Sequence, residues 1–209
     1  MRISFSSDLT GFPLVHLSDL GFDAQLWPVT KNQFASFATS DPIFDTIFQH
    51  ASALNQPQKK AGTRPRIEHD IMTGILPEEA LQFAVWLDNE EPTSDYALPA
   101  VEEWRAVYDA LQYERCDPYL EEIEAYCASE PAQSWLQRIL QTEPHTLLDL
   151  SLMQEGIVEW ALDGESWVGL GRPDTGFYPN TFRPMQETVV PVDATQRMRI
   201  FGCRLIRVF

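Results

Sequence analysis

The stretch Leu150-Ser-Leu-Met-Gln-Glu-Gly-Ile-Val-Glu-Trp160 lies where the character of this 209-residue chain changes. From about residue 30 to residue 146 the apolar residues recur mainly at helical spacing, whereas after residue 146 Gly, Pro and aromatic residues dominate. Apolar runs of strand length then occur at 156–162, 166–170 and 198–208. A run of helices followed by strands predicts an α+β domain, with helices packed around an irregular, mainly antiparallel sheet.

Upstream of this stretch, residues 1–30 predict short strands and turns, and capping residues or prolines then mark a series of helix starts. The expected helices run from Thr30 to Ala38, from Asp41-Pro42 to Leu54, from Pro77 to Leu87, from Pro99 to about Gln112, and onward from Asp117-Pro118 and Glu130-Pro131. In the second helix the i, i+3, i+4, i+7 pattern assigns an inward face to Phe44, Ile47, Phe48, Ala51 and Leu54.

Length and charge restrict the class of protein. The chain predicts a single domain over residues 1–209, and its 44% hydrophobic content is that of a globular protein. The formal net charge of -16 repels nucleic-acid phosphates, so DNA or RNA binding is not expected. The charge serves solubility or matches a basic protein partner.

Cysteine usage favours a reducing compartment. The three cysteines, Cys116, Cys127 and Cys203, form no C-x-x-C pair and are expected to be free buried thiols. No signal peptide precedes the first apolar run, and no stretch reaches the ~18 apolar residues of a membrane span. We therefore expect a cytoplasmic protein that does not enter membranes.

Several segments, in order, resemble motifs of the formylglycine-generating-enzyme (sulfatase-modifying factor) family. Leu150 to Trp160 resembles its L-Y-D-M-x-G-N-V-W-E-W motif, and Phe201-Gly-Cys-Arg-Leu-Ile-Arg207 resembles G-F-R-L-V-R. Three earlier matches are Pro28 to Phe37 with E-V-T-x-x-q-Y-x-x-F, Gly74 to Leu87 with V-S-W-x-D-A-x-A-Y-x-x-W-L, and Tyr96 to Trp104 with Y-R-L-P-T-E-A-E-W. The resemblance covers about residue 26 to the end and implies a C-type-lectin-like fold.

The departures from that family bear on activity. The resemblance implies a copper-binding cysteine pair between the last two motifs, but residues 182–199 contain no cysteine. Cys203 replaces the Phe of G-F-R, which is a packing position. Neither a catalytic residue nor a cofactor is therefore expected, and the chain is interpreted as a non-catalytic member of the family.

The resemblance suggests two kinds of metal site, one for iron and one for calcium. Related iron oxygenases use a His-x-x-x-His-x-Glu triad, but the histidines here are scattered and only Glu68-His69-Asp70 is locally suggestive. The resemblance also implies a possible calcium site near Glu159, where Gly156 replaces the family's Asn. We expect Glu159 to be a structural hydrogen-bonding residue, and no metal site is assigned.

Two segments are candidates for partner or ligand binding. The first is the aromatic and arginine-rich stretch from Asp163 to Pro184, since such side chains anchor protein interfaces. Its candidate binding residues are Trp167, Arg172, Phe177, Tyr178, Phe182 and Arg183. The second is a helical insertion at about 114–146, whose acidic helices either contact a partner or cap the core.

The leading hypothesis is a protein-binding or regulatory module. Family members in bacteria occur beside kinases, NTPases and caspase-like peptidases, which by analogy implies a signalling or defence complex. One alternative is a metal-dependent oxidase with relocated residues such as His16, His69 or Cys203. Another is an acidic inhibitor or decoy that occupies a basic site on its partner.

Overall fold

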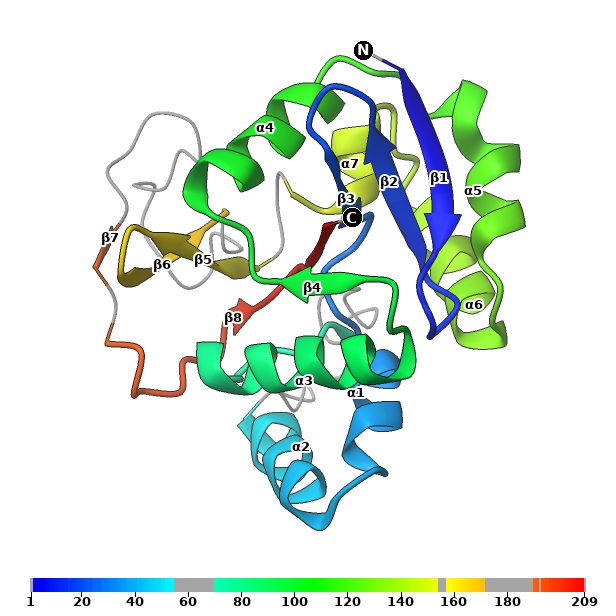
Figure 1. Ribbon diagram of the computed structural model, residues 1–209. Coiled ribbons are helices and arrows are strands. Elements are labelled where there is room, and N and C mark those ends of the chain that lie inside the picture. The colour runs from blue at the N-terminus through cyan, green and yellow to red at the C-terminus, as the bar shows by residue number, and fades with distance from the viewer. Residues whose placement is uncertain (1, 55–69, 154–156, 172–189, 192, 209) are drawn as a thin grey trace, which may run out of the picture.

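The computed structural model describes residues 2–54, 70–153, 157–171, 190–191 and 193–208. Over these residues the chain forms helices and two separate β-sheets, so the expected α+β class is confirmed (Figure 1).

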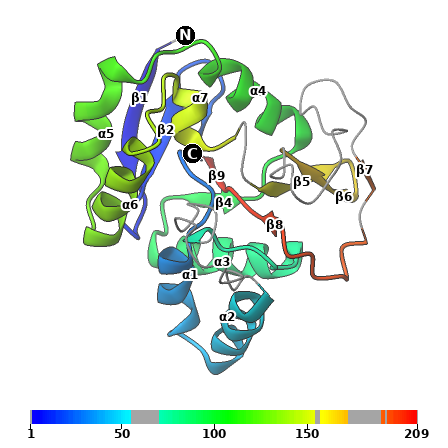
Figure 2. The same cartoon turned by 180° about the vertical axis from the view of Figure 1, so that it is seen from behind.

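The larger sheet contains strands from both the N-terminal and the C-terminal parts of the chain. Its strands are β1 (Ile3–Ser7), β2 (Pro13–Leu17), β3 (Phe22–Gln25), β9 (Ile206–Val208) and β4 (Asp95–Ala97), in that order across the sheet. All neighbours in this sheet are antiparallel. Because β9 lies between β3 and β4, the C-terminal strand is in the sheet interior (Figure 2).

The smaller sheet is built around a hairpin. Its order is β7 (Val190–Pro191), β6 (Ser166–Leu170), β5 (Val158–Asp163) and β8 (Phe201–Gly202). The β5–β8 pair is parallel and the other two pairs are antiparallel. Gly169 of β6 lets Phe201 pack against the hairpin, since a Cβ at this position would lie 2.5 Å from the Phe201 ring.

Most helices begin at or close to the prolines and capping residues that mark them. The helices are α1 (Lys31–Ala38), α2 (Pro42–Leu54), α3 (Pro77–Glu90), α4 (Val101–Leu111), α5 (Leu120–Tyr126), α6 (Glu130–Leu140) and α7 (Leu147–Ser151). The helix expected from Pro99 begins at Val101, a 3-10 turn over Asp117–Tyr119 precedes the helix expected from Asp117-Pro118, and the short helix at Leu147–Ser151 was not expected. At α1, Thr30 accepts a hydrogen bond from the Gln33 amide, and the Gln33 side chain accepts one from the Thr30 amide. This capping box satisfies two amides that would otherwise lack partners.

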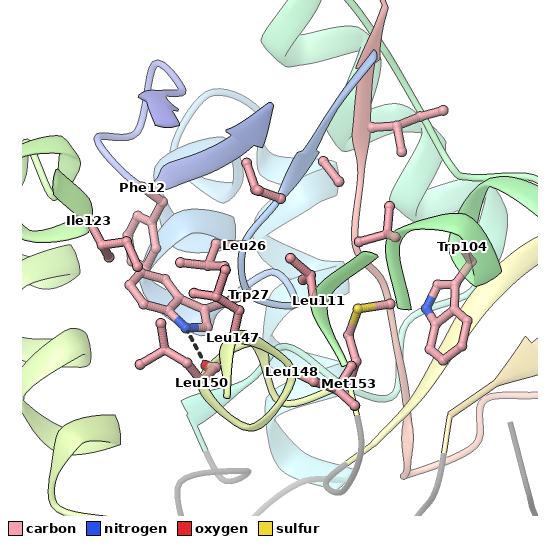
Figure 3. Close-up of a cluster of buried hydrophobic side chains, with 14 of the residues drawn as sticks. Phe12, Leu26, Trp27, Trp104, Leu111, Ile123, Leu147, Leu148, Leu150 and Met153 are labelled. Carbon is pink, nitrogen blue, oxygen red and sulfur yellow. Dashed lines mark hydrogen bonds between the residues drawn. The ribbon is translucent and has the colours of Figure 1, made fainter. Parts of the chain in front are cut away.

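The core consists of two hydrophobic clusters. The first lies between the larger sheet and helices α4 to α7, and Figure 3 shows Phe12, Trp27, Trp104 and Met153 within it. The Trp27 indole in this cluster donates a hydrogen bond to the Leu150 carbonyl at 2.8 Å. The second lies around α1, α3 and the smaller sheet, and includes Phe34, Phe83, Trp160 and Cys203.

The helical segment at 114–146 belongs to the first cluster. Ile123 of α5 and Trp135, Leu136 and Ile139 of α6 are buried. Both helices lie beside β1 in the two views of the fold (Figures 1 and 2). The segment therefore caps the core. It also covers the edge of β1, because the Glu122 carboxylate accepts a hydrogen bond from the Phe5 amide at 3.2 Å.

The inward face expected for α2 is only partly correct. Ala51 is buried and Phe44, Ile47 and Phe48 are partly buried. Leu54 is 44% exposed because it is the last residue of the helix and only its inner side lies near Gly74.

Candidate functional site

A buried ion pair joins the two stretches of sequence that suggested the fold. The Arg204 guanidinium contacts both oxygens of the Glu159 carboxylate, with Nε to Oε2 and Nη2 to Oε1 each at 3.0 Å. The Trp104 indole also donates to Oε2, at 2.8 Å. Glu159 and Arg204 are both buried, each with 1% of its surface exposed to solvent. We call this arrangement the Glu159–Arg204 pair.

All five N–H groups of Arg204 have acceptors, which is the condition for burying a guanidinium. Beyond Glu159, the acceptors are the carbonyls of Gln25, Leu26 and Ser151. The pair thereby ties β5 and the β8–β9 connection to α4, α7 and the end of β3. Glu159 is confirmed as a structural hydrogen-bonding residue, and calcium would have to displace Arg204 to reach its carboxylate.

The three thiols are buried and free, as expected. Burial raises the pKa of the Cys127 thiol to about 12, with a smaller contribution from the Glu124 carboxylate. Burial, and secondarily Glu159, raises the pKa of Cys203 above its usual range. A thiol reacts as its thiolate, so these environments suppress reactivity.

Of the two histidines invoked for relocated metal chemistry, only His16 lies in the described part of the chain, and it contacts Asp23 there. His16 Nδ1 contacts Asp23 Oδ1 at 2.7 Å, and the other Asp23 oxygen accepts from Arg207 at 2.6 Å. His69 lies outside the described residues. Within the residues that the structure describes, no three His, Cys, Asp or Glu side chains gather closely enough to hold a metal ion.

The binding surface predicted from sequence is represented by one residue. Trp167 lies on β6 and packs, partly buried, against the second hydrophobic cluster. The other five predicted binding residues lie outside the described residues: Arg172, Phe177, Tyr178, Phe182 and Arg183.

Apolar side chains are also exposed or partly exposed on helices α2 and α3, where the sequence did not predict a site. They are the partly exposed Phe44 and Trp86, with Ile43 (67% exposed) and Val85 (56% exposed) next to them in the chain. The buried Phe37 ring of α1 joins the two helices, with its centroid 3.9 Å from that of Phe44 and 6.0 Å from that of Trp86. We call these four residues the α2–α3 face.

A signal for this face is present in the sequence. Ile43 and Val85 are apolar residues at positions outside the inward stripe of their helices, which is where polar residues are expected. Figures 1 and 2 both show α2 at the end of the molecule farthest from the N-terminus, beyond α1 and α3.

The charges on these two helices have one sign. Neither α2 nor α3 contains Lys or Arg, and together they contain Asp45, Glu78, Glu79, Asp88 and Glu90. Glu79 is paired with Arg197. Partial burial raises the pKa of Asp88, and the like charge of Asp95 adds to the effect.

A small pocket lies on another side of the molecule, between α1 and α6. Its lining consists of Phe12, Thr30, Asn32, Asp70, Pro131, Ser134, Trp135 and Arg138. Arg138 forms an ion pair with Asp70 at 2.5 Å and lies over the Trp135 ring. Its volume of about 50 Å³ is far below the roughly 300–1,000 Å³ of pockets for small molecules. The α2–α3 face is therefore the better candidate for recognition.

Comparison with known proteins identifies no relative of this chain. No protein-family model matches the chain, and neither a curated protein nor a solved structure matches it. None of the helices in the described part of the chain is both long and apolar enough to cross a membrane.

Proposed function

We propose that the chain is a non-catalytic protein-binding or regulatory module built on a formylglycine-generating-enzyme-like, C-type-lectin-like scaffold. The scaffold assignment rests on the motifs in the sequence. It is supported by the way their key residues are used, because Glu159 of one motif and Arg204 of the other hold each other in the core.

The observation that carries the binding function is the α2–α3 face. Ile43 and Val85 are largely exposed, and the neighbouring Phe44 and Trp86 rings are only partly covered. Aromatic and aliphatic side chains that remain accessible in this way are the usual anchors of protein interfaces. A surface such as this one binds a protein partner.

The environment of the thiols supports a role without thiol chemistry. Buried cysteines with raised pKa values are poor nucleophiles and poor ligands for copper. Free thiols also suit the reducing cytoplasm, where we place the protein. By analogy with bacterial members of the family, its partner belongs to a signalling or defence complex.

Affinity purification of the tagged protein from its native host tests this proposal. Ile43→Ser and Val85→Ser together are expected to lose the captured partner while the protein stays folded. Tyr113→Ser is the matched control, because Tyr113 is 85% exposed and lies beyond the end of α4.

Two other outcomes would count against it. Stoichiometric copper, iron or zinc in the purified protein, or oxidation of a substrate cysteine, would instead support the metal-dependent oxidase. If the partner were lost in high salt but retained by the Ser variants, the acidic inhibitor or decoy would be favoured.

A further inference from the structure

The chemistry of the α2–α3 face selects one kind of partner. Resting on the binding function proposed above, we infer that this face takes a cationic amphipathic segment of a partner protein. Such a segment carries apolar side chains on one side and Lys or Arg beside them.

The aromatic rings of the face are packed on rings beneath them. Phe44 and Trp86 belong to different helices but both contact the same buried ring, Phe37. Phe37 and Phe83 lie beneath them with their centroids 5.6 Å apart, so the exposed rings rest on a packed base. A partly exposed aromatic pair packed on buried rings provides contact area at a low entropy cost of ordering side chains.

Helices α2 and α3 carry carboxylates but no Lys or Arg. Glu78 and Glu90 are exposed at opposite ends of α3, and Asp45 is exposed on α2. Glu90 stands in the last turn of α3, where the helix dipole disfavours a negative charge, whereas the Asp88 carboxylate in the same turn accepts a hydrogen bond from the Tyr96 amide at 2.6 Å. A basic partner would offset this unfavourable placement, whereas an acidic one would increase it.

The same charges disfavour two other occupants. In a two-fold dimer the face would meet its own copy, so the carboxylates of α2 and α3 would oppose one another. An anionic membrane surface would repel a chain of net charge -16. Charge complementarity therefore favours a basic protein segment over a second copy or a lipid surface.

A peptide titration tests the inference. The probe is a fluorescein-labelled amphipathic peptide made of Leu and Lys, and its counterpart has Glu in place of Lys. Fluorescence anisotropy with the full chain is expected to show binding of the Leu/Lys peptide that weakens with added salt, and no binding of the Leu/Glu peptide.

Two pairs of variants separate the contributions. Ile43→Ser with Val85→Ser is expected to weaken Leu/Lys binding about tenfold through lost apolar contact. Glu78→Gln with Glu90→Gln is expected to weaken it several-fold and to reduce the salt dependence. Tyr113→Ser, and Glu121→Gln with Glu124→Gln on α5, are matched controls that should bind as wild type. Circular dichroism verifies that each variant is folded.

Several results would overturn the inference. They are equal binding of the two peptides, no binding of the Leu/Lys peptide at low salt, loss of binding only in the α5 control, or self-association that the Ser variants abolish. If the captured natural partner cross-links to another surface while the peptide fails to bind, this inference fails and the binding function stands. If neither a partner nor the peptide binds, both fail.

Discussion

The Glu159–Arg204 pair and the surface of α2 and α3 that carries the α2–α3 face both combine carboxylates with aromatic side chains, but in opposite situations. In the pair, a carboxylate, a guanidinium and the Trp104 indole satisfy one another inside the core. On α2 and α3, the carboxylates have no Lys or Arg on their own helices, and the aromatic rings of the face are only partly buried. The comparison teaches that the residues of the two sequence motifs serve the scaffold, whereas the binding function proposed above rests on side chains that remain exposed.

The largest expected effect is at the pair. Arg204→Met removes the cation from a buried carboxylate, so the free energy of unfolding should fall by about 3–5 kcal/mol. Urea denaturation measures this loss. Adding Glu159→Gln should restore part of the stability, because the isolated charge is then gone. A loss below about 1 kcal/mol for Arg204→Met would show that the pair does not hold the scaffold.

The same substitution in both regions sharpens the contrast. Trp104→Phe deletes the indole donor to Glu159 and should cost about 1–3 kcal/mol beyond the change in packing. Trp86→Phe, on the partly exposed face, should cost less. Thermal and urea unfolding measure the loss of stability in the two variants. Equal losses would contradict the prediction that the indole of Trp104 matters more for stability than that of Trp86.

A smaller effect is expected from Cys127 at alkaline pH. Its pKa is raised to about 12 in the folded protein, so the unfolded chain releases this proton first. The thiol's contribution to stability is therefore complete below about pH 9 and is lost as the pH rises toward 12. Cys127→Ala should make the decline of unfolding free energy with pH less steep across this window. An unchanged slope would mean that the thiol is not shielded from water.

The smallest effect on stability is expected at the face. Ile43→Ser and Val85→Ser should each change the free energy of unfolding by no more than about 0.5 kcal/mol, since both side chains are largely exposed. Chemical denaturation measures the change, with Tyr113→Ser as reference. A loss of several kcal/mol would place these residues in the scaffold instead of the binding surface.

Much of the fold could be predicted from local signals. Thr30 and Pro77 mark helix starts through capping and proline chemistry, which depend only on neighbouring residues. The sheet order was beyond reach, because the placement of β9 between β3 and β4 depends on contacts between distant parts of the chain.

The site was predicted less well. The hydrogen-bonding role of Glu159 was foreseen, but not that Arg204 and Trp104 would be its partners. Of the predicted binding residues, only Trp167 falls in the described part of the chain, and it packs partly buried. The α2–α3 face was missed because helical periodicity identifies inward positions and says little about apolar residues outside the inward stripe.

Hydrogen exchange of the partner-bound protein tests the central claim most directly. The account predicts that binding slows exchange in residues 42–54 and 77–90, which form α2 and α3, and leaves the segments around Glu159 and Arg204 unchanged. Protection confined to the β5–β6 hairpin that carries Trp167, with α2 and α3 exchanging as in the free protein, would contradict it.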